Sequence, residues 1–196
     1  DLRVMATAAT EAESLDKARA VERQIDTICD KFIFGKDDTT LEETVGRLLA
    51  ADQKTLAIAE SCTGGLLGST ITSAPGASDY FRGGILAYAN ETKTNQLGVS
   101  EQLLKAHGAV SEACARGMAA GARKALGTDY ALSITGIAGP DGGSEDKPVG
   151  LVYIGLADHR SDYARKFQFG GGREAVRLRA VYAALELLRR ELLQIS

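Results

Sequence analysis

The chain has 196 residues, which is enough for one sizeable domain or for a domain with an appendage. Apolar residues make up 44% and charged residues 25%, as in ordinary soluble globular proteins, and the net charge of -3 leaves no basic footprint for a nucleic acid. No apolar run approaches the roughly 20 residues of a membrane span. We therefore expect neither a membrane nor a nucleic acid as a direct partner.

The chain begins without the long apolar segment of a secretory signal and without an initiator Met, so we expect a cytoplasmic protein and a piece of a longer chain. Three cysteines, Cys29, Cys62 and Cys114, form no CxxC pair. This argues against a disulfide scaffold or a cysteine-rich zinc site and fits a reducing cytoplasm. The two histidines, His107 and His159, lie far apart in sequence. We expect no metal and no cofactor, and a catalytic base that is Lys, Tyr or a carboxylate.

Residues 1–36 are predicted to be an appendage. Residues 2–8 alternate apolar and polar side chains as a strand does, and Ser14 is predicted to cap a helix. The apolar side chains at helical spacing are Leu15, Ala18, Val21, Ile25 and Ile28. A strand and a helix cannot make a core alone, so we interpret this segment as a short α+β remnant of an upstream domain. The main domain is then 37–196.

Strands and helices are predicted to interleave from residue 41 onward. A Thr-x-x-Glu capping box at Thr39 or Thr40 opens the first helix, and a turn at 73–76 ends the second. The expected strands are 55–59, 84–89, 130–135, 149–156 and 163–169; further helices are 100–107, 113–126 and 173–194, with a loop or a short helix at 90–97. This order predicts an α/β fold, a three-layer α/β/α sandwich around a mixed sheet. Sites in such sheets lie at the carboxyl ends of strands.

The segment 59–65, Ala-Glu-Ser-Cys-Thr-Gly-Gly, joins an apolar strand to a helix of small residues. Such a turn gathers backbone N–H groups and hydroxyls at one place, so it suits either an anion or a serine nucleophile. Ser61 is a nucleophile if a base lies within reach; otherwise Ser61 or Thr63 simply caps the next helix. Cys62 is a competing nucleophile, or a small buried apolar residue as free cysteines usually are.

Two further groups of residues are candidates for chemistry. Tyr88 ends an apolar strand and Lys93 follows a polar turn; a partly desolvated lysine has a lowered pKa and can act as a base toward a serine. The alternative is a tyrosine at the edge of the core and a solvated lysine. The glycine-rich segments 135–139 and 170–173 suit an anion, and the second opens a helix with Arg173, for which a surface position is the alternative.

Five motifs occur in a fixed order along the chain. They are 59–65, the 80–93 segment that begins Tyr-Phe-Arg-Gly-Gly, 108–111 (Gly-Ala-Val-Ser), 135–140 (Thr-Gly-Ile-Ala-Gly-Pro) and 149–153 (Val-Gly-Leu-Val-Tyr). Together they resemble the CinA C-terminal domain, the nicotinamide-nucleotide amidase (PncC) family. The resemblance covers about 41–194. Residues 1–36 resemble the last strand and helix of the small KH-like linker subdomain in full-length CinA proteins.

The resemblance implies an amidase that converts nicotinamide mononucleotide to nicotinic acid mononucleotide and ammonia in pyridine nucleotide salvage, as a homodimer and without a metal. Ser61 is the implied nucleophile, activated by Lys93 directly or through Tyr88. The implied substrate-binding positions are Glu60, Thr63, Gly64, Gly65, Thr135, Gly136, Gly139 and Arg173. Backbone N–H groups around 63–65 are expected to stabilise the oxyanion. The alternative is a non-catalytic nucleotide-binding or interaction module linked to competence or the DNA damage response.

Overall fold

The computed structural model describes residues 2–195 and divides the chain into two compact units between Thr40 and Leu41. The first unit contains α1, Glu11–Cys29, and the short helix η1, Asp30–Phe32. No residue of either helix is buried, so this unit has no core of its own, as its small size predicted.

Two predictions for the first unit were wrong. Residues 2–8 form no strand. A strand needs a neighbour for its ladder hydrogen bonds, and the described part of this unit contains no second strand. The cap of α1 is Thr10 and not Ser14, because the Thr10 hydroxyl oxygen accepts a hydrogen bond from the N–H of Glu13 at 3.3 Å.

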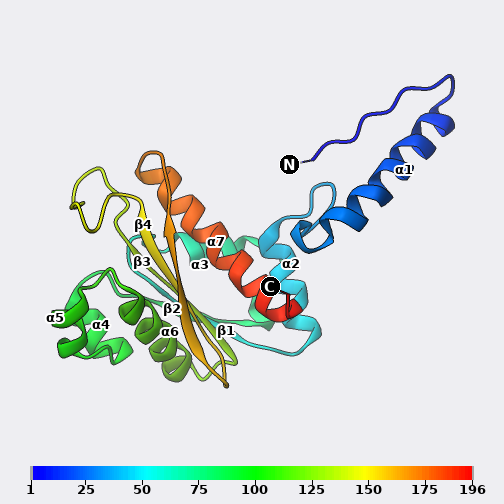
Figure 1. Ribbon diagram of the computed structural model, residues 1–196. Helices are drawn as coiled ribbons and strands as arrows, with labels where there is room; N and C mark the ends of the chain where they lie inside the picture. The colour runs from blue at the N-terminus through cyan, green and yellow to red at the C-terminus, as the bar shows by residue number, and fades with distance from the viewer. Residues whose placement is uncertain (1, 196) are drawn as a thin grey trace. The chain divides into compact units, whose positions relative to one another are not determined.

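The second unit alternates strands and helices along its length (Figure 1). Its elements are α2 Leu41–Ala51, β1 Leu56–Glu60, α3 Leu66–Ser73, η2 Ala77–Asp79, β2 Phe81–Leu86, α4 Asn90–Leu97, α5 Glu101–His107, α6 Glu112–Leu126, β3 Tyr130–Gly136, β4 Leu151–Ala157, β5 Asp162–Gln168 and α7 Arg173–Leu193. The five strands form one sheet in the order β2-β1-β3-β4-β5. The first three are parallel and the last two pairs are antiparallel, which confirms the predicted mixed sheet.

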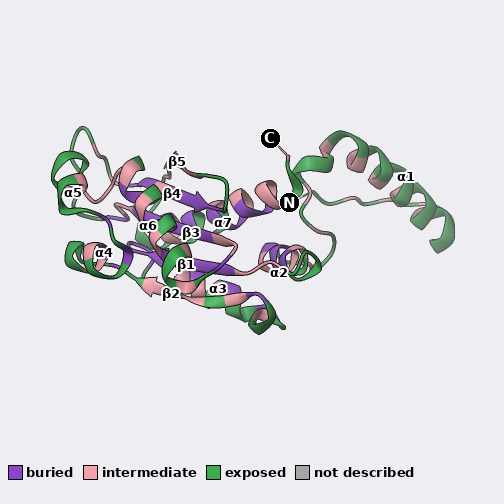
Figure 2. Ribbon diagram, turned by 90° about the horizontal axis from the view of Figure 1, so that it is seen from below, coloured by how far each residue is buried: buried purple, intermediate pink, exposed green. Residues whose placement is uncertain are grey.

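Helices cover both faces of this sheet, which confirms the three-layer sandwich. Helices α2, α3 and α7 contact one another, and α3 and α7 pack on one face; α6, with α4 and α5 beside it, packs on the other (Figure 1). The central strands β1, β3 and β4 are largely buried, whereas the edge strands β2 and β5 are half-buried or exposed (Figure 2). The central strands therefore send alternate side chains into two different cores.

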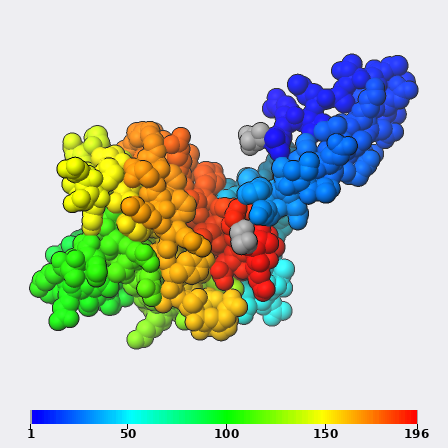
Figure 3. Space-filling model, viewed as in Figure 1, coloured from blue at the N-terminus to red at the C-terminus, as the bar shows by residue number. Residues whose placement is uncertain are grey.

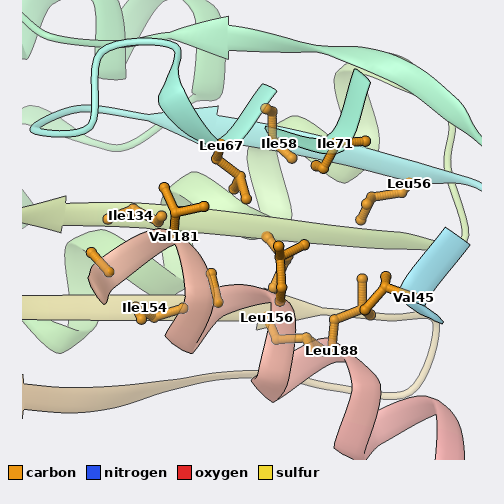
Figure 4. Close-up of a cluster of buried hydrophobic side chains, with 14 of the residues drawn as sticks. Val45, Leu56, Ile58, Leu67, Ile71, Ile134, Ile154, Leu156, Val181 and Leu188 are labelled. Carbon is orange, nitrogen blue, oxygen red and sulfur yellow. The ribbon is translucent and has the colours of Figure 1, made fainter. Parts of the chain in front are cut away.

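Strand β1 shows how the two cores differ. Leu56 and Ile58 enter the core under α2, α3 and α7, a cluster of large aliphatic side chains that also includes Ile134, Val181 and Leu188 (Figure 4). Ala57 and Ala59 face the opposite core under α6, where small residues predominate. Small side chains on this face let α6 lie close to the sheet, while the large face supplies most of the buried apolar area.

Strand β2 begins earlier than predicted, at Phe81 and not at residue 84, because its central glycines are tolerated in an edge strand. A Cβ on Gly84 would overlap the side chain of Ile58, so glycine here allows β2 to approach β1. The polar segment after it is a complete helix, α4, closed by Gly98 at φ +67°. This helix carries Lys93.

Candidate active site

The parallel strands bring the predicted site residues together at their carboxyl ends, along one end of the sheet. Ser61 follows β1, and Ala87 and Tyr88 follow β2. Main-chain pairing continues past the strand ends: the N–H of Ser61 donates to the carbonyl oxygen of Ile134 at 3.0 Å, and the N–H of Ala87 donates to that of Glu60 at 2.8 Å. The backbone on both sides of the site is therefore fixed by the sheet itself.

Ser61 and Lys93 meet at this end of the sheet. Lys93 Nζ lies 3.2 Å from Ser61 Oγ, although the two residues are 32 positions apart in sequence. The same Nζ donates to the carbonyl oxygen of Ala87 at 2.7 Å and to that of Tyr88 at 3.0 Å. Lys93 is 1% exposed and Ser61 is 9% exposed, so the contact is shielded from bulk water.

Burial is the main influence on the Lys93 amine. It lowers the pKa of Lys93 from its usual 10.5, while Cys114, Cys62 and Glu91 oppose the change. All three oxygens around Nζ are hydroxyl or carbonyl oxygens, and none belongs to a carboxylate. The neutral amine is thus favoured relative to an exposed lysine.

Nζ donates to all three oxygens in the structure. A neutral amine keeps the two carbonyl contacts with its two N–H groups and turns its lone pair toward the Ser61 hydroxyl, which can then donate its hydrogen. A base within hydrogen-bonding distance of a hydroxyl can take its proton once the base is neutral, and burial shifts the pKa of Lys93 in that direction. The pair therefore has the geometry of a serine nucleophile with a lysine base.

Tyr88 contacts Lys93 through its backbone. Its carbonyl oxygen accepts the 3.0 Å hydrogen bond from Nζ, whereas the residue as a whole is 68% exposed. Tyr88 therefore lies at the site, but its contact with Lys93 is made by the main-chain carbonyl, which every residue type has. This geometry favours a direct proton transfer between Ser61 and Lys93 over a relay through the Tyr88 phenol.

Cys62 lies next to Ser61 but in a different environment. It is 7% exposed and packs in the large aliphatic core. Burial raises the pKa of its thiol to about 11, and the lowering effects of its own N–H and of Arg173 and Arg177 do not outweigh it. The thiolate is the reactive form of cysteine, so a thiol that stays protonated is a poor competitor for Ser61.

Most N–H groups in the turn after Ser61 already donate a hydrogen bond within the protein. The N–H of Gly64 donates to the carbonyl oxygen of Ser61 at 3.1 Å, and the N–H of Gly65 donates to the Glu60 carboxylate at 3.1 Å. The expectation that the N–H groups around 63–65 are oxyanion donors is corrected for these two glycines, because each already has an acceptor. The N–H of Thr63 has none among residues 2–195.

The two glycine-rich segments come together at the same end of the sheet. Arg173 Nη1, at the start of α7, donates to the carbonyl oxygen of Gly139 at 2.8 Å. The loop after β3 and the beginning of α7 accordingly lie side by side (Figures 1 and 3). Gly139 adopts φ +82°, a left-handed conformation that favours glycine. Arg173 itself is exposed, and the Gly172 cap of α7 makes no side-chain hydrogen bond.

Thr135 and Gly136 have structural contacts in β3. Thr135 is buried, and its hydroxyl donates to the carbonyl oxygen of Ala109 at 2.8 Å, which ties β3 to the segment before α6. A Cβ on Gly136 would lie 2.7 Å from the carbonyl oxygen of Leu151, so glycine permits close packing against β4. Both residues support the loop that carries Gly139.

Sequence reasoning missed Arg177. Its Nη2 donates to the carbonyl oxygen of Thr63 at 2.6 Å and so links α7 to the turn after Ser61. The Nε of Arg177 and the hydroxyl of Thr63 are both buried and have no hydrogen-bond partner within residues 2–195. The available signal was spacing: Arg177 follows Arg173 by one helical turn and therefore lies on the same side of α7.

No group of three or more His, Cys, Asp and Glu residues in 2–195 is arranged to hold a metal ion. No helix within the same range is long and apolar enough to cross a membrane. His107 and His159 lie outside the Ser61–Lys93 contact, which leaves the lysine as the base beside the serine.

The model of the CinA C-terminal domain family matches residues 38–192. This chain belongs to that family. A putative competence-damage inducible protein of Moorella thermoacetica is 49% identical over 185 residues, with 92% of this chain and 45% of the relative covered. A CinA-like protein of Synechocystis sp. is 45% identical over 194 residues, with 97% and 47% covered. The chain spans about half the length of these curated relatives.

Solved CinA superfamily proteins share the fold. A crystal structure from Klebsiella pneumoniae, described as a competence-damaged protein (CinA) superfamily protein, gives a TM-score of 0.76 at 34% identity and covers 79% of this chain and 96% of its own. The competence/damage inducible protein CihA from Agrobacterium tumefaciens gives 0.74 at 36% identity, with 82% and 100% covered. The names of these CinA proteins refer to competence and damage and specify no reaction.

Proposed function

We propose that this CinA domain is a serine amidase that hydrolyses the carboxamide of nicotinamide mononucleotide to nicotinic acid mononucleotide and ammonia. The observation that carries the proposal is the buried 3.2 Å contact between Ser61 Oγ and Lys93 Nζ. It supplies the two groups that acyl transfer needs, a nucleophile and a base, in a site that draws on no histidine.

In the first step, Ser61 Oγ forms a bond to the carboxamide carbon while its proton moves to Lys93 Nζ. The carbonyl oxygen becomes an oxyanion, and the N–H of Thr63 is a donor without another acceptor among the described residues. The carbon–nitrogen bond then breaks, and the Lys93 ammonium gives its proton to the leaving amide nitrogen. Ammonia departs, and the nicotinoyl group remains on Ser61 as an ester.

In the second step, Lys93 acts as a base toward water. Water attacks the ester carbon, its proton goes to Nζ, and the breaking ester bond returns the oxygen to Ser61, which takes the proton back. The products are a carboxylic acid and the free enzyme. In these reaction steps Lys93 both accepts a proton as a base and returns it as an acid. The pKa of Lys93 therefore controls both halves of the reaction.

The phosphate and ribose are assigned to the edge formed by the loop 137–139 and the start of α7. Free N–H groups at a helix start and a nearby guanidinium attract an anion. The uncapped N-terminus of α7 and Arg173 provide both. Arg173 is an otherwise unfavourable residue in a first helical turn, because its charge opposes the helix dipole unless an anion binds beside it.

The test is ammonia release from nicotinamide mononucleotide by the purified chain and by Ser61→Ala. Wild-type protein should release ammonia and Ser61→Ala should not, while the mononucleotide still binds to both. Ser73→Ala is the matched control, since Ser73 is an exposed serine at the end of α3 whose hydroxyl donates to the carbonyl oxygen of Thr70. Full activity in Ser61→Ala would exclude Ser61 as the nucleophile. A chelator should leave the rate unchanged, because no step of this mechanism uses a metal.

The second candidate is a non-catalytic nucleotide-binding or interaction module linked to competence or the damage response, and the names of the relatives support only the link to competence and damage. Binding of the mononucleotide without ammonia release would favour this candidate. For either function we propose a homodimer in the cytoplasm. The three cysteines are free thiols, which fits a reducing compartment.

A further inference from the structure

Strand β1 ends in two neighbouring side chains that face opposite layers. Ser61 turns toward α4 and contacts Lys93. Glu60 turns toward α3, because successive side chains of an extended chain alternate between the two faces. Glu60 is 1% exposed, and its main-chain carbonyl is paired with Ala87. A buried carboxylate directly before the nucleophile therefore requires partners within the fold.

Those partners are the first N–H groups of α3. Glu60 Oε2 accepts from the N–H of Gly65 at 3.1 Å and from that of Leu67 at 3.0 Å, and Oε1 accepts from the N–H of Gly68 at 2.9 Å. The first turn of a helix leaves such donors without acceptors inside the helix. Gly65, at the cap position, has no side chain to serve them. Glu60 serves them from the strand before the turn.

This arrangement fixes the turn that carries Ser61 at both ends. Glu60 holds the side toward α3, and the N–H of Gly64 closes the turn on the carbonyl oxygen of Ser61 at 3.1 Å. On the side toward α7, Arg177 Nη2 holds the carbonyl oxygen of Thr63 at 2.6 Å. The N–H of Thr63 stays without an acceptor among the described residues.

The same arrangement decides where an anion can bind. The N-terminus of a helix is a general site for phosphates and carboxylates. At α3 this place is filled by the Glu60 carboxylate, which also repels a second anion. At α7 the Gly172 cap makes no side-chain hydrogen bond. Both oxygens of Glu60 are engaged, so it is unsuited to bind substrate directly.

We propose that Glu60 is a positioning residue of the active site. It acts through the backbone of the turn, by orienting Ser61 Oγ toward Lys93 and keeping the N–H of Thr63 in place for the oxyanion, and it directs the anionic end of the substrate away from α3. The inference rests on the proposed amidase function for its substrate, but the geometry that it describes is that of the serine itself.

The test begins with Glu60→Gln, which keeps the shape of the side chain but sets an NH₂ group against backbone N–H donors. A displacement of about 1 Å at a reacting group costs about 100-fold, so kcat for ammonia release should fall by about 10–100-fold. KM should change by less than about threefold, because no substrate contact is lost. Glu60→Ala should be partly rescued by added acetate, which supplies the missing carboxylate at the start of α3.

A matched control lies at the other end of the same strand. The Asp129 carboxylate accepts from the N–H of Thr55 at 2.9 Å and from the Thr55 hydroxyl at 2.8 Å, before β1 begins. Asp129→Asn removes a comparable set of hydrogen bonds far from Ser61 along the strand. It should lower the thermal midpoint as Glu60→Gln does and leave kcat unchanged.

A second readout does not depend on the substrate. The rate at which a fluorophosphonate labels Ser61 should fall in Glu60→Gln and recover in Glu60→Ala with acetate. Unchanged kcat and labelling in Glu60→Gln, a change in KM alone, or an equal loss of kcat in Asp129→Asn would each overturn the inference. If wild-type protein releases no ammonia but labels at Ser61 in a Glu60-dependent way, the proposed substrate is wrong and the positioning role stands.

Discussion

Replacing Lys93 by methionine removes the proposed base and keeps most of the side-chain volume. Nζ is the group within hydrogen-bonding distance of Ser61 Oγ, at 3.2 Å. A positioned general base contributes about 10²–10⁴ in rate, so kcat for ammonia release should fall by this factor. At 1.36 kcal/mol per tenfold, the loss of transition-state stabilisation is about 3–5 kcal/mol. KM should change little, because the amine is not assigned to the phosphate or the ribose.

The pH dependence gives the second half of the prediction. Burial lowers the pKa of Lys93 below 10.5, so kcat/KM of the wild type should rise as pH passes through this lowered value and the amine loses its proton. In Lys93→Met this limb should disappear. The free energy of unfolding should also depend on pH. Between the lowered pKa and 10.5 the Lys93 amine holds a proton in the unfolded chain more often than in the folded one. The free energy of unfolding of the wild type, relative to Lys93→Met, should therefore increase with pH in that window.

Ammonia release from nicotinamide mononucleotide, measured over the pH range in which both proteins remain folded, tests the activity, and urea unfolding at several pH values tests the stability. Lys105→Met is the control, because Lys105 is an exposed lysine on α5 that pairs with Glu101 at 3.4 Å. If Lys93→Met keeps kcat within about threefold of the wild type, or keeps the same pH limb, Lys93 is not the base.

Three other substitutions separate the remaining roles. Cys62→Ala should keep most of kcat, because the Cys62 thiol has a pKa raised to about 11 and stays protonated; a loss as large as that of Ser61→Ala would make the cysteine part of the chemistry. Tyr88→Phe should be nearly as active as wild type, since the Tyr88 carbonyl contacts Lys93, whereas a drop of about 100-fold would establish a relay through the phenol. Arg173→Gln should raise KM for the mononucleotide by about tenfold or more and leave KM for the riboside, which has no phosphate, unchanged; equal effects on both would place Arg173 elsewhere.

The elements with local signals were predictable from the sequence. Helix α5 begins after Ser100, whose hydroxyl accepts from the N–H of Leu103, and it ends at Gly108, as predicted. Helix α6 has the same signals in Ser111 and Gly127. Caps and helix-ending glycines act over three or four residues, so the sequence alone contains the chemistry that sets these boundaries.

The mispredicted segments depend on distant partners. The alternation in 2–8 suits a strand, yet a strand forms only where a second strand completes its hydrogen bonds. Residues 81–83 were left out of the predicted strand because glycine usually weakens a strand, whereas Phe81 and Gly83 pair with Leu56 and Ala57 of β1. These features depend on strand partners that are distant in sequence, so neighbouring residues alone do not predict them.

The site residues show the same division between local sequence signals and contacts with distant partners. The turn at Ser61 and the lysine at 93 were both visible as candidates, but their pairing followed from a family resemblance, and the 3.2 Å contact follows from the register of β1 and β2. The family resemblance implied that Glu60 binds substrate. Its role as a partner of α3 depends on the direction in which β1 delivers its side chain. Arg177 reaches Thr63 only because α7 packs on α3.

One residue of β2 has a consequence for how this domain tolerates insertions and deletions. Leu56 pairs with Phe81 and Ala57 with Gly83, so Arg82 is an extra residue without a partner on β1. Because of this extra residue, Phe81 packs on the core under α3 and α7 while Ile85 packs on the core under α6, although residues four apart share a face in a regular strand. Removing Arg82 would leave one-to-one pairing with β1 and keep Ile85 on its present face. Removing one residue after Gly83 would instead exchange the faces of the residues that follow and carry the carbonyl groups that hold Lys93 out of step with Ser61. The domain should therefore tolerate a one-residue deletion at Arg82 better than one between Gly83 and the active site.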